Sequence, residues 1–334
     1  MRVAISGAGG RLGRALVAAF AEAPFTGIAG PLAWDRSAFD LDDPAAAARL
    51  IARDRPEVVV HAAAWTDVDA CARQPELALR RNGTAVGELA RACAAAGADL
   101  VYISTNEVFD GTRTDGRGYL ADDQPSPPNP YGASKLAGEL AAREAYEASA
   151  QSPALAIVRT AWLYGPPGND FPAKILAAAE RARGAREPLR VVGDEFGSPT
   201  STADLAEAVV ELVGSGASGG TWHFVNAGAV SRADWAREIL RLTGTELPLE
   251  EVPAATWPRA SAAPRWAVLE PTLLPSGEPL RPWREALADQ VPWLLRARAS
   301  VPIISSQPTS PAAANQPDPP NPANLANPAN PARS

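Results

Sequence analysis

The sequence predicts an α/β fold, a doubly wound parallel sheet with helices on both faces and a smaller C-terminal region. Three observations support this class. Short apolar runs alternate with helix-length stretches through the first half of the chain, a glycine-rich turn joins the first run to the first stretch, and the second half is less regular. With 334 residues, 46% hydrophobic and 21% charged, the chain suffices for one large domain or two smaller ones.

The first half contains the alternating elements. Apolar runs predict strands at 3–6, at a segment ending near Trp34 and Asp35, and at 58–61, 100–104 and 154–159. Between them, helices are predicted at 11–22, at 44–53 with Asp42 or Asp43 as N-cap, at 76–96, and after Asn129 and Pro130. Strands that alternate with helices pair in parallel, and ligands of such sheets bind at the carboxyl ends of the strands.

The second half predicts strands at 189–192 and 221–225 and helices at 202–213, 232–242 and 282–295. From about residue 300 the composition changes to Pro, Asn, Ala and Ser. Such a segment cannot bury enough apolar surface to offset its ordering entropy. We therefore expect residues 300–334 to be a disordered tail.

Composition also excludes several classes of function. The net charge is −7 and no cluster of Lys and Arg stands out, so nucleic acid is not an expected partner. No apolar run is long enough to span a bilayer and the N-terminus has no signal-peptide layout, so we expect no membrane association and a cytoplasmic protein. The cysteines, Cys71 and Cys93, match no metal or redox spacing, and no metal site is expected.

A glycine turn follows the first predicted strand and opens the first helix. Gly7, Gly10 and Gly13 form a Gly-x-x-Gly-x-x-Gly pattern. Glycines here allow a tight turn and let backbone N–H groups approach a pyrophosphate at the positive end of a helix. The position of this turn predicts a Rossmann-type, dinucleotide-binding domain over residues 1–160, with later segments returning to it.

Two charge signals bear on which nicotinamide cofactor is bound. Asp35 follows the second predicted strand, where a carboxylate binds the ribose 2′-hydroxyl of NADH. Arg36 and Arg11 are instead suited to the 2′-phosphate of NADPH. The sequence leaves NADPH or NADH open, and Asp35 is equally explained as a helix cap or solvated charge.

Tyr131 and Lys135 lie four residues apart, one turn along the same face of the predicted helix. An ammonium near a phenol is expected to lower the phenol's pKa and make it a usable proton donor. Only two of the 31 Lys and Arg residues are lysines, Lys135 and Lys174. At the end of the preceding strand, Ser104 and Thr105 are candidates for polarising a substrate carbonyl, and alternation places them on opposite faces.

The glycine turn, the strand-end hydroxyl and the Tyr-x-x-x-Lys pair, in this order, resemble the extended short-chain dehydrogenase/reductases. Five further segments narrow the resemblance: 61–71 (HAAAWTDVDAC), the Ser-Thr-x-x-Val-Phe-x-Gly motif from Ser104, 131–139 (YGASKLAGE), 159–164 (RTAWLY) and 197–200 (GSPT). Together, over about residues 1–295, they resemble the dTDP-4-dehydrorhamnose reductase family.

The resemblance implies reduction of the 4-keto group of a dTDP-4-keto-6-deoxy sugar by NADPH or NADH. It implies Thr105, Tyr131 and Lys135 as the catalytic residues, and Thr105, Asn106 and Trp162 as substrate contacts within a substrate-binding region over 161–299. The cofactor residues expected from the glycine turn, from Asp35 and Arg36, and from the resemblance are Gly7, Gly10, Arg11, Leu12, Gly13, Asp35, Arg36, Asp40, Leu41, Ala63, Ala64, Trp65, Tyr131 and Lys135.

The chain departs from the family pattern at three places, one of which is Asn169-Asp170-Phe171, where the family commonly has Asn-Asn-Phe. Asn106 and Glu107 stand where an Asp-Tyr pair is common, and residues 263–269 replace a segment that carries an arginine, for which Arg265 is the candidate substitute. Two alternative functions remain: a nucleotide-sugar epimerase or dehydratase, and a non-catalytic NAD(P)-binding regulatory subunit. The expected state is a monomer or homodimer.

Overall fold

The computed structural model describes residues 1–299 except 152 and 217–218. Its centre is a six-stranded sheet in which every pairing is parallel. In sheet order the strands are β10 (Gly220–His223), β5 (Leu155–Thr160), β4 (Asp99–Thr105), β3 (Val58–His61), β1 (Val3–Ser6) and β2 (Leu32–Trp34). Because the chain leaves β1 for β2 on one side and returns to β3 on the other, the strand order reverses beside β1, where ligands of such sheets bind.

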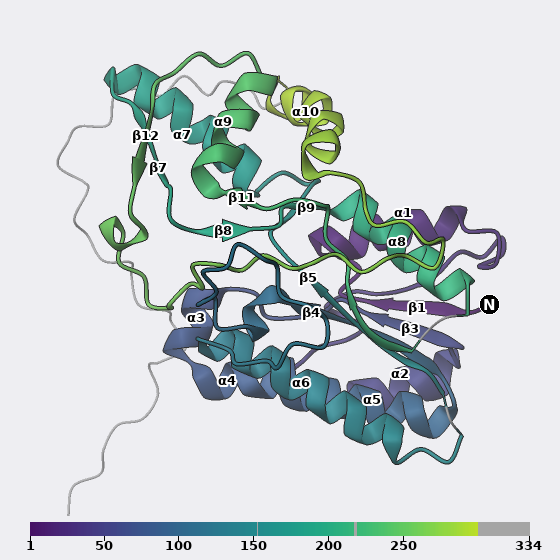
Figure 1. The fold of residues 1–334 in the computed structure, drawn as a ribbon. Helices are drawn as coiled ribbons and strands as arrows, with labels where there is room; N and C mark the ends of the chain where they lie inside the picture. The colour runs from purple at the N-terminus through teal and green to yellow at the C-terminus, as the bar shows by residue number, and fades with distance from the viewer. Residues whose placement is uncertain (152, 217–218, 300–334) are drawn as a thin grey trace, which may run out of the picture.

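Helices cover both faces of this sheet (Figure 1). On one face, α1 (Arg11–Glu22) packs against α8 (Thr202–Gly214). The other face carries α2 (Ala46–Asp54), α5 (Ala85–Ala96) and α6 (Pro130–Glu147). Side chains alternate between the two faces of the sheet along β1, so this strand contributes to two hydrophobic cores. Val3 and Ile5 belong to the core under α1 and α8, whereas Ala4 belongs to the core under α2, α5 and α6. The predicted doubly wound parallel sheet is confirmed.

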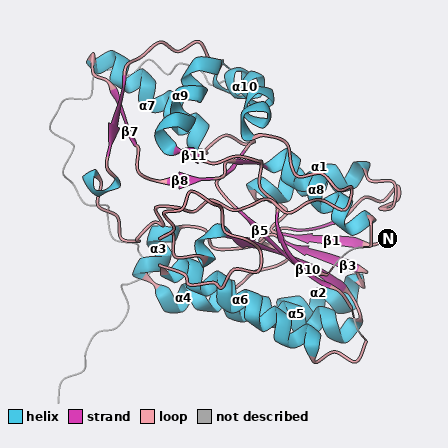
Figure 2. Ribbon diagram, in the orientation of Figure 1, coloured by secondary structure: helices cyan, strands magenta, loops and turns pink. Residues whose placement is uncertain are grey.

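A second, smaller group of elements lies beside the sheet (Figure 2). It contains α7 (Phe171–Ala185), α9 (Arg232–Leu242) and α10 (Trp283–Ala299), which share one hydrophobic cluster with the parallel pair β7 (Leu189–Val192) and β12 (Leu249–Val252). Two short pairs lie between the two groups: β6 (Leu163–Tyr164) with β9 (Thr200–Ser201), and β8 (Phe196–Gly197) with β11 (Val230–Ser231). These short strands were not predicted.

Several boundaries differ from the expectation. The helix predicted at 76–96 begins at Pro75 and is interrupted, since α4 (Pro75–Leu79) is followed by a π-helical turn, η1 (Arg80–Thr84), before α5. The turn directs the Asn82 side chain onto the backbone N–H and carbonyl of Trp65. A short helix, α3 (Val68–Arg73), precedes α4.

Smaller corrections affect two other elements. The helix predicted at 44–53 begins at Ala46, and Asp43 bonds to the Ala45 N–H in the turn before it instead of capping the helix. The strand predicted at 221–225 covers Gly220–His223. Two 3₁₀ turns complete the fold, η2 (Asn106–Val108) and η3 (Ala254–Thr256).

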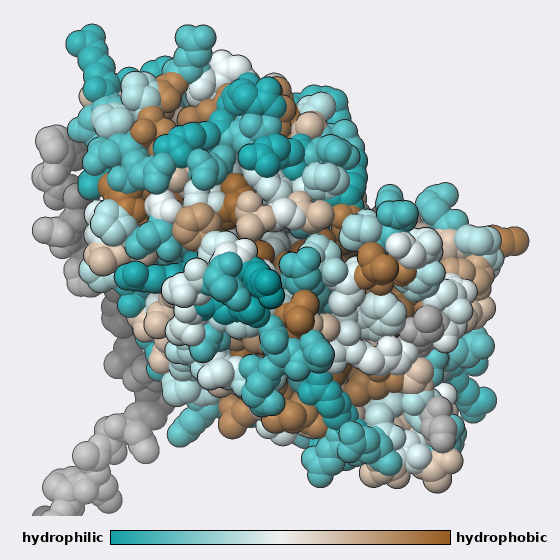
Figure 3. Space-filling view, in the orientation of Figure 1, coloured by the Kyte–Doolittle hydropathy of each residue, from teal (hydrophilic) through white to brown (hydrophobic). Residues whose placement is uncertain are grey.

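The surface is mostly hydrophilic on the face shown in Figure 3, with hydrophobic side chains in separate patches. No helix in the described part of the chain has the length and hydropathy needed to cross a bilayer. The predicted tail at 300–334 lies outside the described residues.

Candidate active site

The glycine turn between β1 and α1 is built from close backbone contacts. Gly7 has a φ of 69°, which favours glycine. A Cβ on Gly13 would lie 2.0 Å from the Gly7 carbonyl oxygen, so no side chain fits there. A Cβ on Gly9 would meet open space, which leaves the outer side of the turn accessible. This cradle suits a dinucleotide pyrophosphate at the N-terminus of α1.

A cavity of about 510 Å³, here called the glycine-turn cavity, opens beside this turn. Most predicted cofactor residues line it, together with Gly9, Ser37, Phe39, Ala62 and Arg81: Gly7, Gly10, Asp35, Arg36, Asp40, Leu41, Ala63, Ala64 and Trp65. One oxygen of Asp35, Oδ1, accepts hydrogen bonds from the Ser37 hydroxyl and from the N–H groups of Ser37 and Ala38, and these hold its pKa below the usual value. Asp35 therefore caps a turn as well as lining the cavity.

Arg81 was not among the predicted residues. Its guanidinium forms an ion pair with Asp42 and lies 5.2 Å from the centre of the Trp65 ring. The glycine-turn cavity thus has two guanidinium groups, Arg36 and Arg81, beside the Asp35 carboxylate. Arg81 belongs to the π-helical turn Arg80–Thr84. Such a turn has no clear sequence signature, so the sequence alone did not point to Arg81.

The Arg11 guanidinium does not lie where contact with the 2′-phosphate of NADPH would require. Its guanidinium donates to the Gly165 carbonyl at 2.5 Å, pairs with Asp170 at 3.1 Å and donates to the Asn169 side chain. It lines a second cavity and not the one with Asp35 and Arg36. Because these contacts tie Arg11 to the loop before α7, it is not placed to receive a 2′-phosphate beside Asp35.

The second cavity, here called the tyrosine cavity, has a volume of about 420 Å³ and is contiguous with the first, since Gly7, Gly10, Ala62 and Ala64 line both. Its wall brings together residues predicted from distant parts of the sequence: Arg11, Leu12, Gly13, Thr105, Asn106, Tyr131, Lys135 and Trp162. The carboxyl ends of β4 and β5 and the first two turns of α6 supply this wall. The three predicted catalytic side chains therefore face one space next to the glycine turn.

Helix α6 positions Tyr131 and Lys135. Asn129 is its N-cap, accepting a 2.9 Å hydrogen bond from the Gly132 N–H, and Pro130 occupies the first turn. Gly132 is required because a Cβ there would lie 2.0 Å from the Glu107 carbonyl oxygen. The start of the helix thus packs directly on the chain that follows β4, which brings Tyr131 to Thr105.

The expected lowering of the Tyr131 pKa is not observed. Burial raises the Tyr131 pKa well above its usual value, the Glu107 carboxylate adds to this, and a hydrogen bond with Thr105 opposes it. The Lys135 ammonium donates at 2.7 Å to the Ile103 carbonyl and lies 4.2 Å from the centre of the Tyr102 ring. Burial lowers the pKa of Lys135 itself to about 7, against the opposing charge of Glu139.

A buried ion pair lies one helical turn beyond Lys135. Glu139 is fully buried and forms two hydrogen bonds with the Arg159 guanidinium, at 3.0 and 2.7 Å. Ser104 donates to the same carboxylate at 2.6 Å. Burial acts to raise the Glu139 pKa, but the contacts with Arg159 and Ser104 outweigh it and hold the pKa below its usual value. Ser104 also lines the tyrosine cavity, but its hydroxyl is committed to this pair, which leaves the Thr105 hydroxyl beside Tyr131.

Asn106 and Glu107 follow Thr105 on the cavity wall. Asn106 donates to the Ala267 carbonyl at 2.9 Å and accepts from the Thr105 hydroxyl at 3.3 Å, so its amide is used within the protein. Glu107 donates its N–H to the Thr105 oxygen at 3.2 Å. One Glu107 carboxylate oxygen, Oε2, accepts from Asn129 at 2.7 Å. Asn106 thus orients Thr105.

Trp162 lies at the far side of the tyrosine cavity in a left-handed backbone conformation, with φ of 44°. Its ring stacks on Trp235 at 5.7 Å, and the Arg232 guanidinium lies 4.2 Å from the ring centre. Gly197 allows this packing, because a Cβ there would lie 2.4 Å from the indole. Arg232 also pairs with Glu195 at 2.6 Å. No motif or spacing in the sequence points to Arg232 as a neighbour of Trp162.

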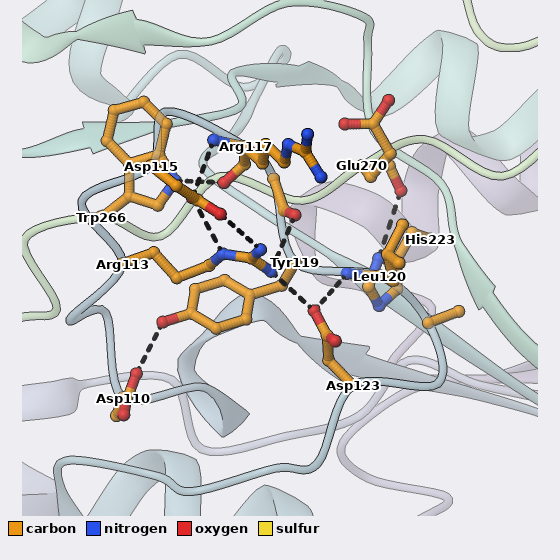
Figure 4. Close-up of polar contacts among 12 residues, drawn as sticks. Asp110, Arg113, Asp115, Arg117, Tyr119, Leu120, Asp123, His223, Trp266 and Glu270 are labelled. Atoms are coloured by element: carbon orange, nitrogen blue, oxygen red, sulfur yellow. Dashed lines mark hydrogen bonds and ion pairs between the residues drawn. The ribbon is translucent and has the colours of Figure 1, made fainter.

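Arg265 lines neither cavity, and its side chain is exposed. Its carbonyl accepts from the Phe196 N–H, and the next residue, Trp266, donates its indole N–H to the Arg117 carbonyl at 2.7 Å. Figure 4 shows this region, where Arg113 pairs with Asp115 and Asp123 beside the Tyr119 ring. The role predicted for Arg265 in substrate binding stays a prediction.

Two further observations bear on the chemistry of the site, one on His61 and one on metal binding. His61 is buried, contacts the Ser6 hydroxyl at 2.6 Å, and has a pKa lowered to about 3, chiefly by burial, so it is neutral and packed. Across residues 1–299, apart from the three that are not described, no group of three or more His, Cys, Asp or Glu side chains is arranged to hold a metal ion.

Comparisons with known proteins agree with this geometry. A family model described as the RmlD substrate binding domain matches residues 1–295. A dTDP-4-dehydrorhamnose reductase of Mycobacterium tuberculosis is 39% identical over 293 residues, covering 86% of this chain and 91% of that protein.

Solved structures give the same result. A dTDP-4-dehydrorhamnose reductase from Clostridium acetobutylicum aligns with a TM-score of 0.78 and 32% identity, over 88% of this chain and 100% of that one. A second, from Bacillus anthracis in complex with NADP, aligns with a TM-score of 0.77 and 32% identity, over 86% and 98%. The chain therefore belongs to the RmlD substrate binding domain family, which includes dTDP-4-dehydrorhamnose reductases.

Proposed function

We propose that this protein reduces the 4-keto group of a dTDP-4-keto-6-deoxy sugar with NADPH or NADH, giving dTDP-L-rhamnose or a close relative. The observation that carries the proposal is the convergence of Thr105, Tyr131 and Lys135 on one cavity that continues into the glycine turn. The activity printed for the relatives supports the same reaction class. A nucleotide sugar is the proposed partner, and a monomer or homodimer the proposed state.

The residues present fit a nicotinamide cofactor. The cradle at Gly7 and Gly13 leaves no space for side chains, as close backbone approach to a pyrophosphate requires. Asp35, Arg36 and Trp65 would hold the adenosine end, and Lys135 the ribose at the other end. When bound, the reduced cofactor supplies the hydride for the carbonyl carbon.

The chain's own residues handle the oxygen of the carbonyl. Tyr131 donates its proton to that oxygen as negative charge develops. The phenol is protonated at neutral pH, but burial raises its pKa and makes it a weaker acid than a free tyrosine. Thr105 accepts from the Glu107 N–H and donates to Asn106 at 3.3 Å, so its hydroxyl proton turns from Asn106 to the carbonyl oxygen when the substrate is bound. The Lys135 ammonium has three donors, of which the Ile103 carbonyl takes one, leaving others for ribose hydroxyls.

The proposal is tested by following the loss of nicotinamide absorbance with dTDP-4-keto-6-deoxy-L-mannose, prepared in situ, and either NADPH or NADH. Turnover is expected in the wild type, and Tyr131→Phe should lower kcat by about 10²- to 10⁴-fold while cofactor affinity changes little. Stoichiometric cofactor oxidation separates a reductase from an epimerase or dehydratase, which needs no net reductant. No oxidation with either cofactor would contradict the proposal.

A further inference from the structure

The Glu107 carboxylate has an unusual position in the tyrosine cavity. Glu107 lines this cavity with Tyr131 and Thr105, and its carbonyl oxygen packs against Gly132, the residue that follows Tyr131. Its negative charge helps to raise the pKa of the Tyr131 phenol. The mechanism above uses the backbone N–H of Glu107 but not its side chain. A carboxylate in this position offers a hydrogen-bond acceptor to the substrate, and none of the catalytic residues has that role.

The two oxygens of this carboxylate differ. Oε2 accepts the 2.7 Å hydrogen bond from Asn129, which also donates to the Ala262 carbonyl at 2.9 Å and is thereby fixed. Among the described residues, Oε1 of Glu107 has no hydrogen-bond partner, and it is not sealed from solvent. An ionised carboxylate only accepts hydrogen bonds. The free oxygen is therefore available to accept a hydrogen bond from a donor that reaches it.

The surroundings act on the Glu107 carboxylate in both directions. Burial raises the Glu107 pKa above its usual value, the Asn129 hydrogen bond and the positive charges of Arg259 and Arg232 oppose this, and Glu195 adds to it. Arg232 pairs with Glu195, and Arg259 pairs with Asp69 at 3.3 Å, so neither forms an ion pair with Glu107. The wall thus presents a carboxylate held by an amide and open on one side.

We propose that Glu107 is a specificity-determining residue whose Oε1 accepts a hydrogen bond from the ring hydroxyl next to the carbonyl that is reduced. The inference rests on the proposed function, because Tyr131 locates the carbonyl and Glu107 lies beside Tyr131. The hydroxyl on the neighbouring ring carbon, C3 for a 4-keto sugar, is the nearest donor a substrate can offer there. The same carboxylate disfavours a sugar that lacks this hydroxyl, because its oxygen then loses water without gaining a partner.

The test compares two substrates in two variants. Wild type, Glu107→Gln and Glu107→Ala are assayed with dTDP-4-keto-6-deoxy-L-mannose and with its 3-deoxy analogue. In Glu107→Gln the amide oxygen takes the Asn129 hydrogen bond, so an N–H₂ donor replaces the free acceptor while the shape is kept. A charge-assisted hydrogen bond to the hydroxyl predicts a fall in kcat/KM of about 10- to 100-fold for the hydroxylated substrate.

For the 3-deoxy analogue the same variants should not lower kcat/KM, and Glu107→Ala should raise it, because the oxygen that loses water without gaining a partner is gone. This difference between substrates separates a direct contact from the effect of Glu107 on the Tyr131 proton, which acts on both substrates alike. Glu147→Gln, the same substitution at the exposed end of α6, is the matched control and should leave both rates unchanged. NADPH binding and thermal unfolding of each variant report whether it is folded.

Equal losses on both substrates in folded Glu107 variants would overturn the inference while leaving the reductase proposal intact. Wild-type kcat/KM that is equal for the two substrates would overturn it as well. Failure of the wild type to reduce either sugar would instead refute the proposed function, and the inference would fall with it. Loss confined to the hydroxylated substrate supports both.

Discussion

Replacing Glu139 with glutamine should destabilise the protein strongly and change its catalytic pH range. Arg159 is 2% exposed and its guanidinium forms two hydrogen bonds with the Glu139 carboxylate, which is fully buried. The substitution keeps the shape and leaves a buried cation without a counter-charge. Removing one partner of such a pair costs about 3–5 kcal/mol, because the remaining charge stays out of water. For a chain of this size, at about 2 °C per kcal/mol, Tm should fall by roughly 6–10 °C.

The same change acts on Lys135, one helical turn away. The Glu139 charge raises the Lys135 pKa against the larger effect of burial, so its removal should lower that pKa below about 7. Lys135 acts as an ammonium, and the alkaline limb of kcat/KM in the free enzyme should therefore move to lower pH in Glu139→Gln. A pH–rate profile measured below the unfolding temperature records this shift.

Glu250→Gln is the matched control for this substitution. Glu250 pairs with Arg190 at 3.7 Å, and both side chains are about half exposed, at 52% and 49%. Such a surface pair contributes at most about 1 kcal/mol. If Glu139→Gln lowered Tm no more than Glu250→Gln does, the buried Glu139–Arg159 pair would not be important for the stability of the fold. An unchanged alkaline limb would refute its electrostatic link to Lys135.

Three other predictions follow from single side chains. Gly13→Ala should weaken cofactor binding and lower stability, because its Cβ would lie 2.0 Å from the Gly7 carbonyl oxygen. The control Gly184→Ala in α7 places a Cβ in open space and should be neutral or stabilising by up to about 1 kcal/mol. Cofactor titration and thermal unfolding check both variants. Arg36→Ala should raise KM for NADPH about tenfold more than KM for NADH, since Arg36 lines the glycine-turn cavity beside Asp35; an equal effect on both would contradict a 2′-phosphate contact. In the wild type, kcat/KM should fall as pH rises through about 7, where Lys135 loses its proton, and Lys135→Arg should abolish that limb while lowering the rate.

The regular elements of the sheet were predictable from the sequence because their periodicity is local. Val3 to Ser6 and Val58 to His61 are short apolar runs, and α1 and α9 match the predicted boundaries. The glycine turn was predictable for a similar reason, since Gly13 and Gly7 must approach closely wherever a strand turns into a helix over a pyrophosphate. Local patterns and an ordered set of motifs therefore sufficed to predict the fold and most of the cavity wall.

Other features depend on contacts between distant segments. The interruption of the helix at Arg80–Thr84 serves the side chain of Asn82, whose partner Trp65 follows β3. Arg11 contacts Gly165 and Asp170, more than 150 positions along the chain, and no local pattern announces such a bridge. These contacts removed Arg11 from the 2′-phosphate site.

The Tyr131–Lys135 spacing shows most clearly what a motif leaves undetermined. It places both side chains on one face of α6, but it specifies neither their exposure nor the direction of the ammonium. In the folded protein the Lys135 ammonium donates to Ile103, and burial raises the Tyr131 pKa instead of lowering it. A raised pKa makes the phenol a weaker acid and therefore a poorer proton donor. In the chain by itself, burial therefore opposes proton transfer from Tyr131, and the Lys135 ammonium, which donates to Ile103, does not offset this effect.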